Sequence, residues 1–213
     1  MMLASALLMA YGASPEGTIL GLHDQWLLDG PYAILMDYAL RHGELPLWNP
    51  LILAGLPYAA ANSSVFYPPN LLRACFTALF LPDTPFSTYA SMLTMVALHF
   101  LFAACGVFLL ARDHRIGWWG AFAAGALYMG SAPYGRFLFE AWQILAGSAW
   151  LPWVLWSTRR AMLASSRTQR YRWTILAGLA FGIAILPGFA QMTCYLSVAI
   201  AVYAAMISLV TPA

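Results

Sequence analysis

Long apolar runs separated by short polar segments make up most of the chain after residue 86. This pattern predicts helices over 87–111, 117–133, 142–157, 173–187 and 189–210. The last two helices come from one apolar run, Trp173–Val210, whose 38 residues would make a helix about 57 Å long. That is too long for one membrane crossing, so we expect Pro187-Gly188 to divide it.

An earlier apolar run occupies residues 2–13 and would form about 18 Å of helix, less than a bilayer core requires. A signal peptide is the alternative, but no positively charged segment precedes the run. We therefore interpret residues 1–13 as part of a first transmembrane helix.

The segment 14–86 differs from the rest because it is rich in proline, aromatic residues and carboxylates. We expect a short helix over Pro31–His42, since proline suits a first helical turn and Gly43 suits a helix end. Asp37 and Arg41 would form a solvated i,i+4 pair on this helix, which would lie along the membrane surface.

Composition then sets the class of protein. Charged residues are 8% of the chain, against about 25% in soluble domains, and 62% of residues are hydrophobic. The sequence therefore predicts an all-α polytopic membrane protein, a single module over 1–213 with about six transmembrane helices. All ten basic residues are arginine, and none form a basic tract with interleaved aromatics, so nucleic acid is not an expected partner.

Arginine distribution predicts the orientation. The loops after the second and fourth expected helices carry seven arginines, whereas the loops after the first, third and fifth carry three arginines and seven acids. The positive-inside rule then places the N-terminus in the cytoplasm and segment 14–86 outside. Residues 135–141 and the Pro187-Gly188 turn fall on the same external side.

Several motifs appear in a fixed order. Asp24 is followed seven residues later by Pro31, and GELPLWNP (43–50) and FYPPN (66–70) come next. WLPW (150–153) and the stretch from GLAFG (178–182) to LPGFAQ (186–191) follow. Together they resemble YfhO-type bacterial membrane proteins of the GT-C class of membrane glycosyltransferases. Phe189-Ala190 departs from the family's histidine-proline, and family members are several times longer, so the chain resembles an N-terminal module or a truncated relative.

The resemblance implies sugar transfer from a polyprenyl-phosphate-linked donor at the external face of the bacterial inner membrane. Asp24 matches the acidic residue near the start of the family's first external loop, taken to be the base that deprotonates the acceptor hydroxyl. A positioned carboxylate accelerates such an attack by about 10²–10⁴-fold. The alternative to a catalytic role is that Asp24 is an ordinary solvated loop acid or a helix cap.

Other polar residues have two interpretations each. A group of aromatic and amide residues either lines a groove for sugar or lipid phosphate, or satisfies loop backbone and anchors at the interface: Trp48, Asn49, Asn62, Tyr67 and Asn70. We also expect Trp48, Pro50, Tyr67 and Pro68 to pack together, because proline-broken backbone at a membrane needs shielding.

Three further positions concern charge. Arg136 either holds the donor phosphate or pairs with Glu140, and Gln191 follows the external turn as a second donor-binding candidate. No cofactor is certain. A divalent cation between Asp24 and Asp29 is compatible with a phosphate-linked donor, but the spacing is unspecific, and the sequence favours Asp29 as a helix-start residue stabilised by the helix dipole. His99, within an apolar run, is expected to be neutral and hydrogen-bonded to a neighbouring helix.

A second class of function also fits the sequence. The chain would then be a non-catalytic integral membrane subunit of a larger complex, with membrane lipid and other proteins as partners. A transporter is a third hypothesis, but no inverted repeat or mid-membrane charge pair supports it.

Overall fold

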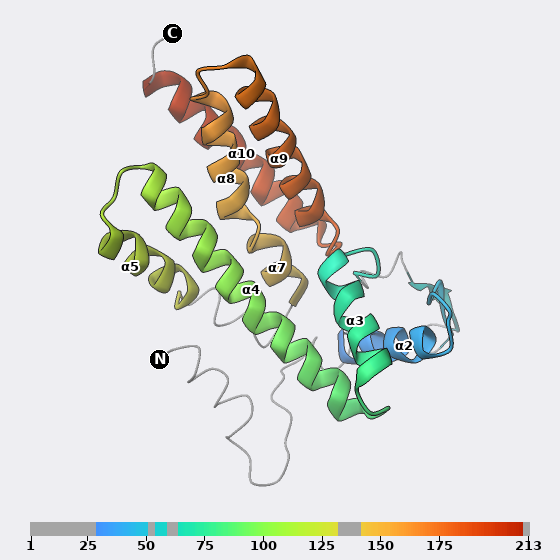
Figure 1. Cartoon of the computed structure of the whole chain (residues 1–213). Helices are drawn as coiled ribbons and strands as arrows, with labels where there is room; N and C mark the ends of the chain where they lie inside the picture. The colour runs from blue at the N-terminus through green and yellow to red at the C-terminus, as the bar shows by residue number, and fades with distance from the viewer. Residues whose placement is uncertain (1–28, 51–53, 59–63, 132–141, 211–213) are drawn as a thin grey trace. The chain divides into compact units, whose positions relative to one another are not determined.

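The computed structural model describes residues 29–50, 54–58, 64–131 and 142–210, and within these ranges the chain is mostly helical (Figure 1). The chain divides into two compact units. Unit 1 comprises residues 1–99 and 132–145, and unit 2 comprises residues 100–131 and 146–213. Helix α4 (Pro85–Asp113) contributes its first half to unit 1 and its second half to unit 2.

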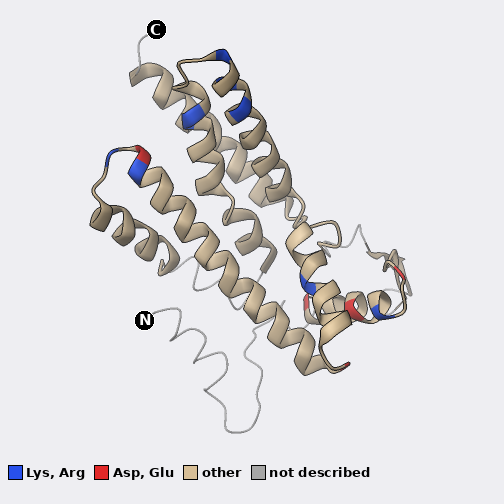
Figure 2. Ribbon diagram, in the orientation of Figure 1, with Lys and Arg blue, Asp and Glu red and all other residues tan. Residues whose placement is uncertain are grey.

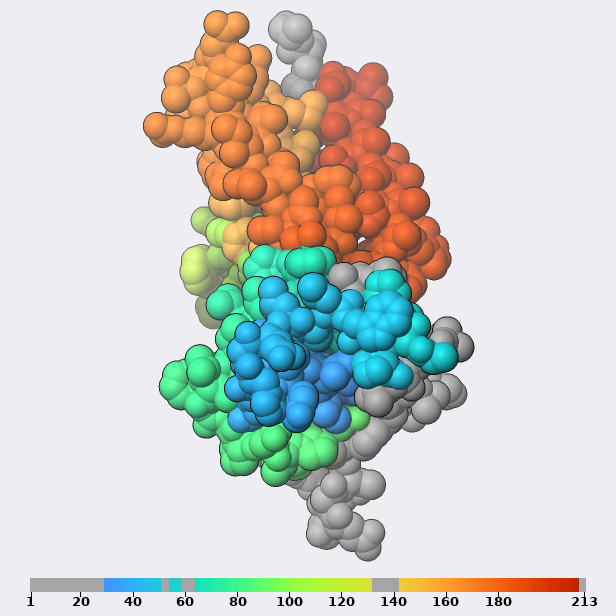
Figure 3. Space-filling view, turned by 90° about the vertical axis from the view of Figure 1, so that its right-hand side faces the viewer, coloured from blue at the N-terminus to red at the C-terminus, as the bar shows by residue number. Residues whose placement is uncertain are grey.

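Unit 1 is built on helices α2 (Gly30–Arg41) and α3 (Pro68–Phe80), which pack against each other. Both helices carry proline in the first turn, where the missing N–H costs no hydrogen bond. Gly43 follows α2 with φ of +74°, the left-handed conformation that ends a helix at least cost in glycine. Figure 3 shows α2, in blue, in front of the blue-green residues of α3.

The core of unit 1 joins the two helices to the chain between them. Its buried residues are Tyr32 and Met36 from α2, Ala74 from α3, and Tyr58 and Val65 from the connection. The connection also forms a small antiparallel pair of strands, β1 (Trp48–Asn49) and β2 (Leu56–Pro57), with Trp48 opposite Pro57 and Asn49 opposite Leu56.

Two expectations for segment 14–86 need correction. The sequence predicted one helix in this segment, but the structure contains α3 as well as α2. Helix α2 also does not carry Asp37 on a solvated side, because Asp37 is buried together with Tyr32 and Met36.

Unit 2 contains the second half of α4 with α5 (Trp118–Met129), α8 (Leu151–Met162), α9 (Arg167–Ile185) and α10 (Ala190–Val210). Glycines allow α4 to approach its neighbours closely. A Cβ on Gly125 of α5 would lie 2.8 Å from the Ala104 carbonyl oxygen, and one on Gly106 would lie 2.7 Å from Trp153 Nε1 of α8. Trp153 Nε1 donates to the Phe102 carbonyl at 2.9 Å.

The helix expected over 142–157 is divided in the structure. Helix α7 (Trp142–Ser148) ends before α8 begins at Leu151. Pro152 lies in the first turn of α8, where proline is tolerated, whereas a continuous helix would have placed it in the interior. The proline in the WLPW motif therefore marks a helix start. Between α9 and α10 lie Pro187 and Gly188, the latter with φ of +87°.

Two helices in the described part of the chain are long and apolar enough to cross a bilayer, α4 and α10. Their most apolar windows have mean hydropathies of 2.3 and 2.0. Only 11% of that window in α10 is buried, so its apolar side chains largely face outward, unlike those of a core helix in a soluble protein.

Candidate functional site

The polar centre of unit 1 is an ion pair between Asp37 of α2 and Arg73 of α3. Arg73 Nη2 donates to Asp37 Oδ1 at 2.8 Å, and Nη1 donates to Oδ2 at 3.1 Å, a bidentate arrangement. Asp37 is 2% exposed and Arg73 7%. The expectation that Asp37 is a solvated partner of Arg41 is therefore wrong, because Asp37 faces α3 and is shielded from water.

Neutral side chains complete the hydrogen bonding of this pair. Thr88 Oγ1 donates to Asp37 Oδ2 at 2.7 Å, Arg73 Nη1 also donates to Ser91 Oγ at 2.9 Å, and Arg73 Nε donates to Asn70 Oδ1 at 3.0 Å. A buried ion pair is tolerated when further hydrogen bonds satisfy both charged groups, as they do here. The pair therefore links α2, α3 and α4, and its guanidinium is already engaged.

Arg41 has a different role from the one expected. Its guanidinium donates to the carbonyls of Thr77, Ala78 and Leu81 at 2.9, 3.0 and 2.9 Å, at the end of α3. The last carbonyls of a helix lack intrahelical donors and carry partial negative charge, so a cation there is favourable. Arg41 Nε also lies 3.4 Å from Asp83 Oδ1, an exposed carboxylate.

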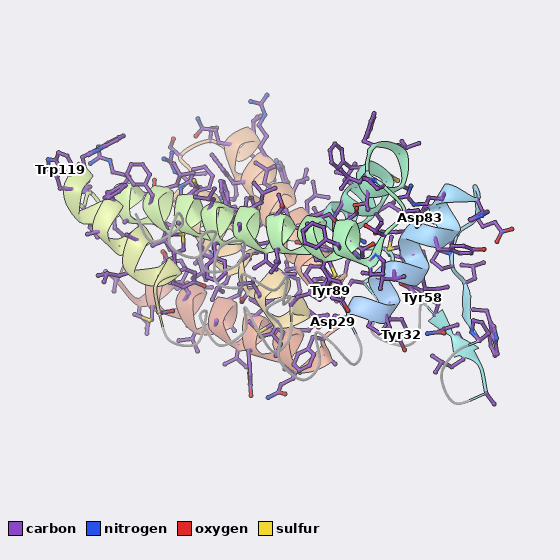
Figure 4. The ribbon with its side chains drawn as sticks, turned by 90° about the horizontal axis from the view of Figure 1, so that it is seen from below. Asp29, Tyr32, Tyr58, Asp83, Tyr89 and Trp119 are labelled. Carbon is purple, nitrogen blue, oxygen red and sulfur yellow. The ribbon has the colours of Figure 1, made fainter. Side chains whose placement is uncertain are left out.

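Tyr58 fixes the connection between the helices. Its hydroxyl donates to the Tyr32 carbonyl, and the two rings meet edge to face with centroids 5.2 Å apart. Burial raises the pKa of Tyr58 above its ordinary value, because a phenolate would lose its hydration there. Tyr58 is therefore a structural hydrogen-bond donor. Figure 4 shows both tyrosines beside α2.

His99 of α4 has a hydrogen-bonding partner from a neighbouring element. Tyr67, which precedes α3, places its hydroxyl 2.6 Å from His99 Nε2, and His99 Nδ1 lies 2.7 Å from the Met95 carbonyl. Since a carbonyl only accepts, Nδ1 carries the proton and Nε2 accepts from the tyrosine, which describes a neutral imidazole. The expectation of a hydrogen-bonded histidine is confirmed.

Beside this polar centre lies an open apolar groove between α3 and the first half of α4. Its volume is about 600 Å³. Apolar side chains form most of its wall, including Leu72, Phe76 and Leu98, all exposed. Polar atoms enter only where Arg73, Ser91, Thr94 and His99 reach the lining. The groove suits a ligand that is chiefly hydrocarbon.

Asp29 lies at the start of α2 but makes no side-chain capping bond there. It is buried, and Gln143 Nε2 of α7 donates to its Oδ1. Tyr32, Asn70 and Trp142 surround the same enclosed space, whose free volume of about 10 Å³ admits no substrate. No group of three or more potential metal ligands occurs among the residues that the structure describes.

The predicted site residues are not brought together within the described ranges. Asp24, Asn62 and Arg136 lie outside those ranges. Tyr67 and Asn70 belong to the buried centre of unit 1, and Asn49 is buried in β1. Gln191 is exposed on α10, where its side chain donates to the Tyr195 hydroxyl.

Trp48 does not pack with Tyr67 as expected. It is 55% exposed, whereas Tyr67 is fully buried. The Trp48 indole instead covers Gly55 across the strand pair, where a Cβ would lie 2.6 Å from its Cζ2. Gly55 has φ of +106°, so both the turn and the indole require glycine at this position.

Sequence reasoning missed Arg73, Thr88 and Ser91 as members of the polar centre. The available signal was Arg73 itself, a single charge among apolar residues of the FYPPN-led helix. An arginine in such a run requires a partner, and a buried carboxylate is the usual one.

No protein family model, curated protein or solved structure matches this chain. The motif resemblance is therefore a hypothesis that rests on the residues alone.

Proposed function

We propose that this chain is a multi-pass membrane protein that binds the hydrocarbon chain of a lipid-linked substrate in the groove between α3 and α4. The main observation that supports this proposal is the size and the apolar lining of the groove. Its volume of about 600 Å³ falls within the range of about 300–1,000 Å³ typical of ligand pockets. A sugar or nucleotide alone would find few hydrogen-bonding groups there, because Arg73 and His99 already have partners. A polyprenyl chain needs none.

The proposed membrane arrangement has six spans, with the N-terminus in the cytoplasm and segment 14–86 outside. The helices α4 and α10 and the low content of charged residues, 8%, support it. The arginine distribution supports the orientation, and the motif resemblance supports the bacterial inner membrane as the location.

The proposed chemistry follows the motif resemblance: a GT-C-like glycosyltransferase, or its N-terminal portion. The acceptor hydroxyl attacks the anomeric carbon of the donor sugar, Asp24 takes the hydroxyl proton, and the bond to the polyprenyl phosphate oxygen breaks. Arg136 and Gln191 are the proposed contacts of the departing phosphate. No metal is required by this scheme.

The groove is tested by filling it. Leu98 is 58% exposed and lines the groove, and Leu127 of α5 is 74% exposed and does not. We expect Leu98→Trp to lower photolabelling by a photoactivatable polyprenyl phosphate about tenfold, equivalent to about 1.4 kcal/mol of binding free energy. Leu127→Trp is the matched control and should label like the wild type. Equal labelling of both variants would rule out the groove as the lipid site.

The transfer chemistry is tested separately. Asp24→Asn preserves side-chain shape and removes the base, so sugar transfer by the complete protein should fall at least about 100-fold. Glu44, which is exposed, provides the control: Glu44→Gln should leave transfer unchanged. If polyprenyl phosphate binds but Asp24→Asn transfers sugar normally, lipid binding stands and the assignment of the base fails.

The alternative function is a non-catalytic membrane subunit, and the outward-facing side chains of α10 favour it. A photo-crosslinker placed at Val202, which is exposed, distinguishes the two cases in native membranes. Crosslinking to one defined protein supports the subunit, and crosslinking to lipid alone supports the independent enzyme.

A further inference from the structure

Unit 2 carries a strong imbalance of charge. Seven of the chain's ten arginines lie in it, at positions 112, 115, 159, 160, 167, 170 and 172, with Asp113 as the only carboxylate. Asp113 is already bound on both oxygens, by Arg159 Nε at 2.9 Å and by Arg160 Nε at 2.6 Å. The remaining arginines therefore have no carboxylate within unit 2 to neutralise them.

These arginines come from three separate segments that unit 2 brings to one end. Arg112 and Arg115 lie where α4 ends, Arg160 lies near the end of α8, and Arg167, Arg170 and Arg172 begin α9. The ion pairs of Asp113 join the end of α4 to the end of α8. Figure 2 shows the basic segments of these helices in blue. We call this surface the arginine end.

Exposed aromatic residues border the arginine end. Trp118 and Trp119 begin α5, directly after the α4–α5 connection at 114–117, and Tyr171 lies among the arginines of α9; all three are exposed. The Arg160 guanidinium lies 5.8 Å from the Trp156 ring and 5.7 Å from the Trp173 ring. Tryptophan and tyrosine next to arginine, at the ends of apolar helices, are typical of the membrane–water interface.

An apolar surface continues from this end along α10. His114 Nε2 lies 2.8 Å from the Tyr203 hydroxyl, which fixes the last turns of α10 beside the end of α4. Leu209 and Val210 in those last turns are exposed. A nucleic acid or an acidic peptide would leave these side chains in water, whereas a lipid covers both the arginines and the apolar surface.

We propose that the arginine end binds the phosphate headgroups of anionic phospholipids. Guanidinium groups suit this ligand because each presents a planar fork of donors to phosphate oxygens. Clusters of four to eight basic residues beside a membrane helix are a recognised feature of anionic-lipid binding. This site lies in unit 2 and is independent of the groove proposed for the substrate chain. In the proposed topology it faces the cytoplasmic leaflet.

The test uses the full chain in detergent with an equimolar mixture of phosphatidylglycerol and phosphatidylcholine that have identical acyl chains. Native mass spectrometry measures which lipid stays bound. We expect the wild type to retain phosphatidylglycerol over phosphatidylcholine by at least about fivefold. The triple variant Arg167→Gln, Arg170→Gln, Arg172→Gln should retain the two lipids about equally, because these side chains are exposed and their loss leaves packing intact.

Two control variants test whether charge is responsible and whether the substrate groove is involved. The corresponding triple lysine variant keeps the charge and should preserve a preference for phosphatidylglycerol. Leu98→Trp fills the substrate groove and should leave the preference unchanged, which separates this proposal from the proposed function. Equal retention of both lipids by the wild type, an unchanged preference in the glutamine variant, or complete displacement of phosphatidylglycerol by inorganic phosphate would each overturn the assignment.

Discussion

The buried Asp37–Arg73 ion pair is expected to contribute strongly to the stability of unit 1. Both charges lie out of water, and each is held by hydrogen bonds from a second helix. Asp37→Asn removes the negative charge and leaves Arg73 buried without its counter-ion. Breaking one side of such a pair costs about 3–5 kcal/mol, because the remaining charge has no hydration.

We therefore expect Asp37→Asn to lower the free energy of unfolding by about 3 kcal/mol, measured by denaturant unfolding in detergent. Glu44→Gln, at an exposed position, should change it by less than about 0.5 kcal/mol. Equal stability of the two variants would mean that the ion pair is solvated and that α2 does not pack on α3 through it.

The same residues show the limit of sequence reasoning at this scale. The i,i+4 rule paired Asp37 with Arg41 because both lie on one helix. In the fold, each instead reaches α3, with Arg73 36 positions from Asp37 and Thr77 36 positions from Arg41. An i,i+4 ion pair on a helix surface contributes only a few tenths of a kcal/mol. The buried bidentate pair of Asp37 with Arg73, and the contact of Arg41 with the C-terminal carbonyls of α3, are both stronger interactions.

At the scale of elements, the sequence predicted where a helix begins and ends more reliably than it predicted which elements pack against each other. Pro31 and Gly43 marked α2 because their backbone constraints are local. Helix α3 was not recognised because its two leading prolines suggested broken loop, although proline is well placed in a first turn. Trp48 was expected to pack with Tyr67 because proline-broken backbone needs shielding, but in the fold its indole covers Gly55 across the strand pair.

Close approach between α4 and α5 gives a prediction at this scale. A Cβ on Gly125 would meet backbone, the Ala104 carbonyl oxygen, at 2.8 Å. Backbone cannot rotate away as a side chain can, so Gly125→Ala should destabilise the protein by about 1–3 kcal/mol. Thermal unfolding in detergent measures the change.

Gly178 in α9 is the matched control, because a Cβ there meets nothing within 4 Å. Gly178→Ala should be neutral or stabilise by up to about 1 kcal/mol, as alanine is the better helix former. If Gly125→Ala is as well tolerated as Gly178→Ala, α5 does not contact α4 in the way described.

At the scale of the whole molecule, the proposed topology has the chain crossing the membrane several times, with segment 14–86 outside and the arginine end inside. Composition alone predicts the membrane class, and α4 and α10 have the length and composition that a span requires. The predicted number of spans is less well supported, because α8 carries two arginines in its last turn and α5 has only 12 residues.

Cysteine accessibility in intact cells tests the proposed topology most directly, in a background with Cys75, Cys105 and Cys194 replaced by alanine. Glu44→Cys represents the outer segment and Ser165→Cys the arginine end, both at exposed positions. We expect an impermeant maleimide to label Glu44→Cys in intact cells and to label Ser165→Cys only after permeabilisation. Labelling of Ser165→Cys from outside, with Glu44→Cys protected, would contradict the orientation and, with it, both the substrate site and the lipid-headgroup site.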